Sequence, residues 1–172
     1  MTLRQISMAA LAAAAVCLPV ATNAKTPAPV SEAVAAPSTE ADNKAIVEGL
    51  YRAFAAGDGA AIGAVFSPDI VWNEAEGGPY ADHNPYTGPA AVFEGVFGRI
   101  GQQWQGFAAT PVTVLPSGDK VVVLGRYTGV NKATGRTLNA QFAHVYTLVD
   151  GKIVGFQQYT DTAQWVATST AD

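Results

Sequence analysis

Four strand-like segments stand one after another in the second half of the chain, and they constrain the fold more than any other feature. They cover residues 107–115, 120–130, 136–149 and 152–162, and turns of two to five residues join them. The last turn is Asp150-Gly151, a strong signal for a two-residue hairpin. Strands joined by such short turns pair antiparallel, so this half of the chain predicts a meandering sheet.

Helix-like segments precede these strands. In residues 43–56, Ile46, Leu50 and Phe54 recur at four-residue spacing, which is typical of an amphipathic helix. Three more elements are expected before the sheet: a short helix that begins at Asp58, a strand over 70–72 and a helix over 89–105. Helices gathered ahead of strands predict an α+β fold, in which three helices cover one face of a curved antiparallel sheet and enclose a pocket.

The N-terminus has the layout of a secretory signal peptide. Arg4 supplies a positive start, an uncharged Ala/Leu/Val-rich stretch follows, and the small residue Ala24 closes it. A membrane span needs roughly 20 strongly apolar residues, whereas Pro19 interrupts this Ala-dominated stretch. We therefore expect cleavage after Ala24 (residues 1–24 removed) and an exported protein, periplasmic or secreted, with no membrane contact after cleavage.

The segment after the signal peptide predicts no packed structure. Residues 25–42 contain three prolines among Ala, Ser, Thr and Glu, without a helical or strand period, and are expected to form a disordered tether. The folded domain is expected over residues 43–166, with a tail over 167–172. Cleavage would also remove Cys17, the only cysteine, so an oxidising compartment would do the protein no harm.

Composition excludes several classes of partner. Ten Lys and Arg stand against 14 Asp and Glu, and the net charge of −4 comes with no basic cluster, which argues against nucleic acid. Two His and one Cys leave no material for a zinc site or a disulfide framework. Neither a metal nor a cofactor is expected.

Several stretches of the chain resemble one family. The opening of the SnoaL-like branch of the NTF2-like superfamily is similar to LYRAFAAGD (50–58) and FSPDIVW (66–72), and its closing hairpin to FAHVYTLVDGKIV (142–154) and QQYTD (157–161). The resemblance covers residues 44–165. It implies the cone-shaped NTF2-like (cystatin-like) fold and a homodimer formed through the outer face of the sheet. It does not name a reaction, because the superfamily includes isomerases, cyclases, epoxide hydrolases, dehydratases and domains without chemistry.

The resemblance also implies which reactions this chain does not retain. Glu74 falls where ketosteroid isomerases carry their carboxylate base. The two oxyanion donors of those enzymes fall on Leu50 and Ala143, and each missing donor costs about 3–4 kcal/mol of transition-state stabilisation. The acid/base Asp of polyketide cyclases falls on Gln158, and the Asp-Arg-Asp set of epoxide hydrolases matches Arg126 alone.

Strand alternation predicts which side chains face the pocket. We take Glu74, Arg126, Gln158 and the face of Ala143 as inward. The ligand-binding side chains expected from the strands are then Trp72, Thr128, Gln141, Phe156 and Gln158, and Tyr86 of the loop and Phe93 of the third helix are expected to join them. A few polar groups in a mostly apolar cavity are typical of a small-molecule site.

The roles of the charged and titratable groups stay open. Glu74 is expected to act as a base and Arg126 to stabilise developing negative charge, or the two form a structural ion pair. His144 is expected on the outer face, as a structural or interface residue. A register shift of one residue in 136–149 would bring it into the pocket as the best general base. His83 lies in an irregular loop, where it either gates the pocket or is merely solvated.

Two function classes follow. One is an exported enzyme that performs proton transfer, of isomerase, hydratase or lyase type, on a small, largely apolar molecule. The other is a domain of the same fold that binds such a molecule, or interacts with a partner, without catalysis.

Overall fold

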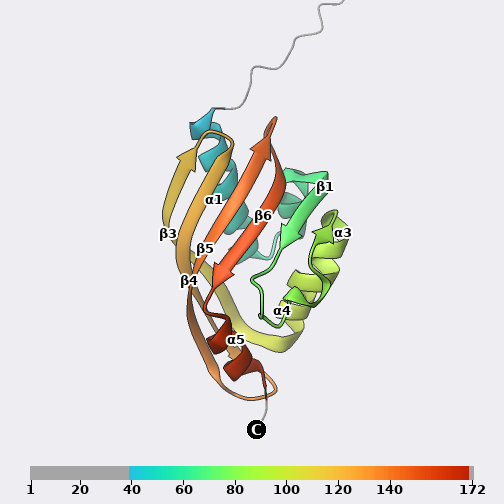
Figure 1. Cartoon of the computed structure of the whole chain (residues 1–172), viewed down its shortest axis with the longest axis vertical. Helices are drawn as coiled ribbons and strands as arrows, with labels where there is room; N and C mark the ends of the chain where they lie inside the picture. The colour runs from blue at the N-terminus through green and yellow to red at the C-terminus, as the bar shows by residue number, and fades with distance from the viewer. Residues whose placement is uncertain (1–38, 171–172) are drawn as a thin grey trace, which may run out of the picture. The chain divides into compact units, whose positions relative to one another are not determined.

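A computed structural model describes residues 39–170 (Figure 1). The predicted signal peptide over 1–24, residues 25–38 of the predicted tether and the end of the predicted tail lie outside the described residues. Within 39–170, no helix is long and apolar enough to span a membrane. These residues build the α+β fold that the sequence predicts, with helices packed on one six-stranded sheet.

The first helix begins earlier than its apolar spacing indicates. Helix α1 (Glu40–Ala56) starts at a capping box, in which Thr39 and Asp42 each accept a hydrogen bond from the other's backbone N–H. Of the two residues that the sequence offers as caps, Asp42 belongs to this capping box, whereas Asn43 is buried and donates from Nδ2 to the carbonyl of Gly118. The helix ends at Gly57, whose φ of 69° is left-handed, as its glycine predicts.

The remaining helical segments before the long strands follow the predicted order. Asp58 caps α2 (Gly59–Val65) by accepting from the N–H of Ala61. A loop with the short segments η1 (Ala81–His83) and β2 (Tyr86–Thr87) leads to the third helix. That helix runs over 89–103 in three consecutive parts: α3 (Pro89–Val92), the π-helical η2 (Phe93–Gly98) and α4 (Arg99–Gln103).

Six strands form a single mixed sheet. Their bounds are β1 (Phe66–Asn73), β2 (Tyr86–Thr87), β3 (Trp104–Ser117), β4 (Lys120–Asn131), β5 (Thr137–Val149) and β6 (Lys152–Thr160), in the order β2-β1-β6-β5-β4-β3. One pair differs from the expected antiparallel sheet, because β1 and β6 run parallel. No short turn joins these two strands, so the hairpin geometry that fixes the other directions does not apply to them.

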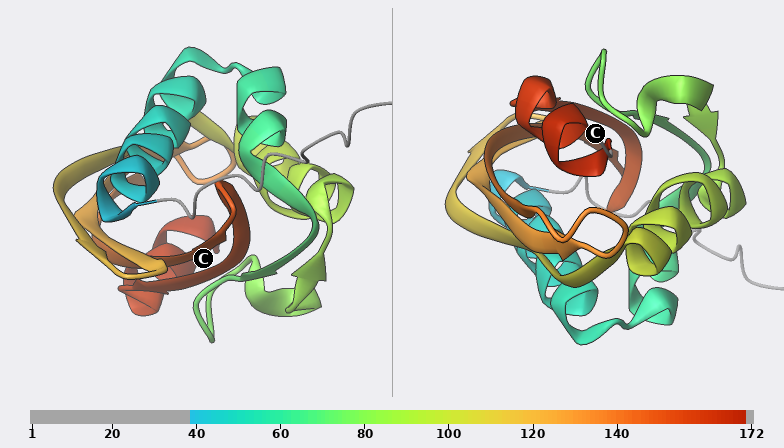
Figure 2. Two further views of the ribbon diagram at one scale, coloured as in Figure 1. Left: turned by 90° about the horizontal axis from the view of Figure 1, so that it is seen from above. Right: turned by 90° about the horizontal axis from the view of Figure 1, so that it is seen from below.

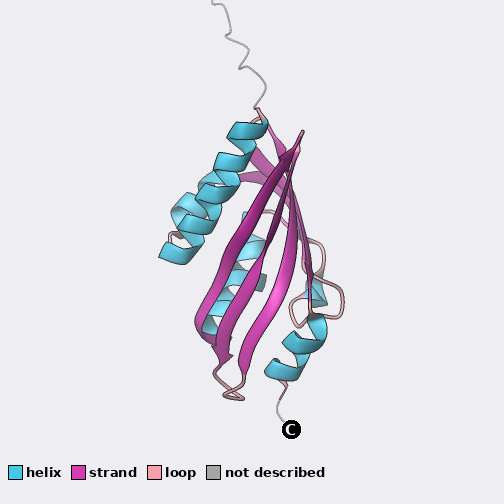
Figure 3. Cartoon of the chain, turned by 90° about the vertical axis from the view of Figure 1, so that its left-hand side faces the viewer, coloured by secondary structure: helices cyan, strands magenta, loops and turns pink. Residues whose placement is uncertain are grey.

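The sheet curls, and α1 and the helix over 89–103 lie on its inner side (Figure 2). Seen from the side, α1 lies along the long strands, and α5 (Thr162–Ser169) lies at the end of the sheet away from the start of α1 (Figure 3). Helix α5 takes in residues expected as the end of the last strand and the beginning of a tail. Asp161 caps it by accepting from the N–H of Gln164.

Helix α5 brings Trp165 into the core. The sequence places this indole between the last strand and the first helix. Instead it packs among four rings from the loop before α3 and from β3 and β4, with centroid separations between 5.2 and 5.8 Å: Tyr80, Trp104, Phe107 and Tyr127. The C-terminal helix therefore closes one end of the interior.

Candidate functional site

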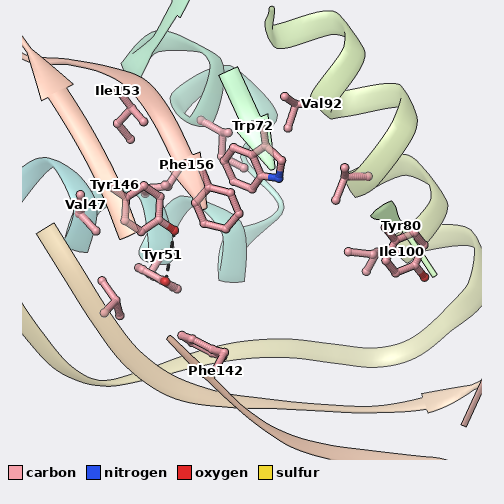
Figure 4. Close-up of a cluster of buried hydrophobic side chains, with 14 of the residues drawn as sticks. Val47, Tyr51, Trp72, Tyr80, Val92, Ile100, Phe142, Tyr146, Ile153 and Phe156 are labelled. Carbon is pink, nitrogen blue, oxygen red and sulfur yellow. Dashed lines mark hydrogen bonds between the residues drawn. The ribbon is translucent and has the colours of Figure 1, made fainter. Parts of the chain in front are cut away.

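A cavity of about 50 Å³ lies between α1, the inner face of the sheet and Trp165 of α5. Most of its wall is aromatic or aliphatic, and Figure 4 shows part of that wall, with Trp72 stacked on Phe156 at a centroid distance of 3.6 Å. The polar groups of the wall come from seven residues: Tyr51, Trp72, Tyr127, His144, Tyr146, Gln158 and Trp165.

A continuous hydrogen-bond network crosses this wall. The Nδ1 atom of His144 lies 2.6 Å from the hydroxyl of Tyr51, and its Nε2 atom lies 2.5 Å from the hydroxyl of Tyr127. The hydroxyls of Tyr146 and Tyr51 are 3.2 Å apart and are joined by the dashed line in Figure 4. At the other end, Gln158 donates from Nε2 to the Tyr127 oxygen at 2.9 Å, while its Oε1 accepts from the N–H of Ala75.

Burial fixes the protonation state of this network. It lowers the pKa of His144 to about 3, so the imidazole is neutral at physiological pH. Burial also raises the pKa of Tyr51, Tyr127 and Tyr146, so all three hydroxyls keep their protons. The network is therefore uncharged.

Counting protons shows that one hydroxyl is left without an acceptor. Three hydroxyls and one neutral imidazole carry four protons, whereas the links Tyr146–Tyr51, Tyr51–His144 and His144–Tyr127 use only three. The 3.5 Å contact of Tyr146 with Nδ1 competes with Tyr51 for the same ring atom and adds no link. Among residues 39–170, no other acceptor lies within hydrogen-bond distance of these hydroxyls. We call this fourth proton the surplus proton. It resides on one of three tyrosines that all line the cavity.

Glu74 is a buried carboxyl beside the cavity. Its Oε1 accepts from Nε1 of Trp72 at 2.6 Å, and its backbone N–H and carbonyl are both held by the side-chain amide of Asn84. Burial raises the pKa of Glu74 to about 7, although hydrogen bonds from Trp72 and Gln158 act in the opposite direction. None of the ion pairs within the described part of the chain involves Glu74. The carboxyl can therefore gain or lose a proton near neutral pH.

The inward face of β4 and β5 is the opposite of the one expected. Arg126, Thr128 and Gln141 point outward and are exposed, because β4 and β5 pair with Tyr127 opposite Ala140 and with Val123 opposite His144 on the inner face. Arg126 donates to the carbonyl and side chain of Asn139, so it forms no ion pair with Glu74.

The same reversal of faces places His144 inside. It is only 4% exposed and lies on the inner face, which is the alternative that a one-residue change of register predicts. The pattern of β5 carries the signal, because even-numbered positions hold Leu138, Phe142, Tyr146 and Leu148, whereas their odd-numbered neighbours are mostly polar or small.

The other predicted residues divide into two groups. Trp72, Phe156 and Gln158 line the cavity, where alternation places them. Phe93 packs on Phe66 and Phe97 in the core, and Tyr86 is buried in the loop, donating its hydroxyl to the carbonyl of Tyr80; neither lines the cavity.

Sequence reasoning missed the tyrosines of the network. Tyr51 is expected only as a core or pocket-wall residue, without a polar role, and nothing in the sequence singles out Tyr127 or Tyr146. His83 is exposed, and its Nε2 atom lies 3.9 Å from a carboxylate oxygen of Asp82. Over residues 39–170, no group of three or more His, Cys, Asp or Glu side chains could hold a metal ion.

A larger groove adjoins the cavity. The α1–β3 groove, about 770 Å³ in volume, is lined by residues of α1 between Lys44 and Ala55 and by residues 107–114 of β3. The groove and the cavity share four wall residues: Tyr51, Phe54, Phe107 and Ala109. The rings of Phe54 and Phe107, whose centroids are 6.2 Å apart, therefore stand between the two spaces.

Comparisons with known proteins agree with this architecture. Residues 47–156 match the family model described as a SnoaL-like domain. An NTF2-like protein from Burkholderia thailandensis is 33% identical, with a TM-score of 0.71 over 75% of this chain and 98% of that one. An NTF2-like protein from Burkholderia pseudomallei is 27% identical, with a TM-score of 0.69 over 76% and 98%. The protein TerC, co-crystallised with polyporic acid, is 26% identical, with a TM-score of 0.67 over 74% and 97%. No functionally curated protein matches the chain.

Proposed function

Because the chain belongs to the SnoaL-like family, we propose that it binds a small, largely apolar molecule in this cavity and moves a proton on that molecule with Glu74. One observation carries the proposal. A buried carboxyl with a pKa near 7 lies beside the apolar cavity and is hydrogen-bonded to Trp72 and Gln158 of its wall, and the tyrosine network of that wall carries a hydroxyl with a surplus proton.

The two groups suit an isomerase, hydratase or lyase type of reaction. The ionised Glu74 accepts a proton from a carbon next to a carbonyl group, and the electron pair of the broken C–H bond moves toward the carbonyl oxygen. The surplus proton stabilises the negative charge on that oxygen through a hydrogen bond. Glu74 then returns the proton to another carbon, or a leaving group departs with it. The oxyanion donors that the family's isomerases use are absent here, and a tyrosine of the network takes their place.

The cavity alone is too small for a typical ligand, so the proposed site includes the α1–β3 groove. Small-molecule sites typically enclose about 300–1,000 Å³, which is far more than the cavity provides. The groove adds about 770 Å³ behind the rings of Phe54 and Phe107. We propose that the ligand enters from this groove and that both rings turn to admit it. The complex of TerC with polyporic acid supports a small organic molecule as the ligand.

Recovering the ligand is the first test. Native mass spectrometry of the protein from its own host should show a bound molecule, which then serves as substrate. Glu74→Gln is expected to lower turnover by on the order of 10²–10⁴ and to leave the dissociation constant within about twofold, because the amide keeps the hydrogen bond from Trp72 but accepts no proton. Progress curves and calorimetric titration measure the two quantities.

Glu76→Gln is the matched control, since this carboxylate lies two residues away and is exposed. It should leave both quantities unchanged. Equal turnover by Glu74→Gln and wild type would contradict the assignment of Glu74 as base.

The second candidate is a binding domain without chemistry. Gln158 favours it, because a side chain that cannot exchange a proton lines the cavity where cyclase relatives are expected to carry an acid. In that case wild type and Glu74→Gln would both release the recovered molecule chemically unchanged.

Export and dimerisation extend the proposal. The N-terminal pattern supports export to the periplasm or beyond. The outer face of the sheet supports a homodimer, because Leu124 and Tyr159 are 42% and 58% exposed there, beside Ala143.

Light scattering at micromolar concentration tests the dimer. Wild type should have twice the mass of the chain, and Leu124→Glu should have the monomer mass, because the substitution buries a charge at the proposed interface. Val166→Glu, on exposed α5, should stay dimeric. A monomeric wild type would contradict the proposal.

A further inference from the structure

The chain has three tryptophans, and their indole N–H groups differ in one respect. Trp72 donates to Oε1 of Glu74 at 2.6 Å, and Trp104 donates to the hydroxyl of Tyr80 at 2.8 Å. The Nε1 atom of Trp165 is buried and has no acceptor anywhere in residues 39–170. A buried donor without a partner is costly, so native proteins leave few of them unexplained.

Trp165 stands at the wall of the cavity. It is 3% exposed and lines the same space as the tyrosine network. Its ring lies 5.2 Å from that of Tyr127, nearly perpendicular to it at 77°. The unpaired donor and a candidate for the surplus proton are therefore neighbours.

The cavity wall has more unpaired hydrogen-bond donors than free acceptors. The surplus proton and the Trp165 N–H are two donors without acceptors. The acceptors are largely engaged, because Oε1 of Gln158 accepts from Ala75 and both ring nitrogens of His144 face tyrosine hydroxyls. A molecule that fits this wall brings acceptor oxygen and little donor capacity.

We infer that Trp165 donates a hydrogen bond to an oxygen of the bound molecule, and that this molecule is an apolar carbonyl compound, such as a ketone, quinone, ester or lactone. The inference rests on the proposed binding function. A carbonyl oxygen has two lone pairs, so it can accept from the indole and from a tyrosine hydroxyl together. Helix α5 thereby becomes part of the binding site, and Trp165 selects for oxygen among molecules of equal shape.

Acetophenone and ethylbenzene are suitable probes, because they share a ring and a two-carbon substituent and differ in the carbonyl oxygen. In a ¹H–¹⁵N spectrum of the purified protein, three indole signals are expected, and the signal missing from Trp165→Phe is that of Trp165. Acetophenone should move this signal downfield, while ethylbenzene should not. If Trp165→Phe fails to fold, Trp72→Phe and Trp104→Phe assign the signal by elimination.

Affinities provide the second measurement. The dissociation constant of ethylbenzene divided by that of acetophenone should be about tenfold larger for wild type than for Trp165→Phe, as expected when a single hydrogen bond is lost. The smaller Phe ring affects the binding of both probes alike, so its effect cancels in this ratio. Val166→Ala, the exposed neighbour on α5, should keep the wild-type ratio.

Two results would overturn the inference, and they are distinguishable. If both probes shift cavity signals but the Trp165 indole signal stays in place and the affinity ratio is unchanged, the N–H is satisfied by a neighbouring ring or by water. The proposed binding site then stands and the role of Trp165 falls. If neither probe shifts any cavity signal up to its solubility limit, the inference and the proposed binding function fall together.

Discussion

At pH 8, Glu74→Gln is expected to raise the free energy of unfolding by on the order of 3 kcal/mol, which is the free-energy equivalent of the raised carboxyl pKa. Burial raises the pKa of Glu74 to about 7 from an ordinary value of 4.5. The ionised form is therefore unfavourable in the folded protein, and an uncharged amide removes that penalty. The amide oxygen keeps the hydrogen bond from Trp72.

The sign of the pH dependence follows from the direction of the shift. Below pH 4.5 the carboxyl is protonated in both the folded and unfolded states, and it has no effect. Between pH 4.5 and about 7 the unfolded state releases the proton while the folded state keeps it, so stability falls as pH rises. Above pH 7 the loss is complete. Glu74→Gln removes this decline.

Urea unfolding followed by tryptophan fluorescence at a series of pH values measures the effect. Glu76→Gln, at an exposed site, should reproduce the wild-type curve. A Glu74→Gln variant no more stable than wild type at pH 8 would show that the carboxyl is well solvated or compensated. A gain in stability on losing the carboxyl is the signature of a residue kept for function rather than for folding.

His144 should produce the opposite slope. Burial lowers the pKa of His144 to about 3, so between that pH and 6.5 only the unfolded state binds the proton. Stability from this residue is complete above pH 6.5 and is lost as pH falls, at about 1.4 kcal/mol per pH unit. In wild type the slopes of His144 and Glu74 nearly cancel between pH 4.5 and 6.5.

The effect of His144 therefore emerges when Glu74 is neutralised. Glu74→Gln should lose on the order of 3 kcal/mol of stability between pH 6.5 and 4, and Glu74→Gln combined with His144→Gln should lose little. The hydroxyls of Tyr51, Tyr127 and Tyr146 surround the imidazole and stay protonated throughout this range. Equal slopes for the single and the double variant would show that His144 does not titrate on unfolding.

The sequence predicts where the helices and strands lie better than it predicts which face of each strand points inward. The four-residue spacing in α1, Pro89 at the start of the third helix and Asp150-Gly151 in the last hairpin each indicate the element found there. These signals are local, because each depends on residues a few positions apart. Helix α5 is missed because only Trp165 and Thr168 of its eight residues are buried, which leaves almost no apolar period.

The inward-facing polar residues of the site can be identified only when the pairing register of β4 and β5 is known. Placing Arg126 and Gln141 inward followed from a resemblance at single positions, whereas the alternating burial of β5 belongs to the whole strand. The network of Tyr51, Tyr127 and His144 joins residues up to 93 positions apart, so no spacing in the sequence points to it. The resemblance places Glu74 as an inward-facing acid of the pocket, whereas the structure buries it beside the cavity, where Trp72 of the wall donates to it.

The parallel pairing of β1 with β6 sets the order in which the site can be completed. Trp72, which precedes Glu74 by two residues, pairs with Phe156, and the Gln158 amide reaches the Tyr127 hydroxyl from the last strand. Trp165 follows in the last helix. A ribosome therefore synthesises every residue up to Trp165 before the proposed pocket is complete. We therefore expect a nascent chain, or a chain shortened before α5, to lack the proposed binding competence.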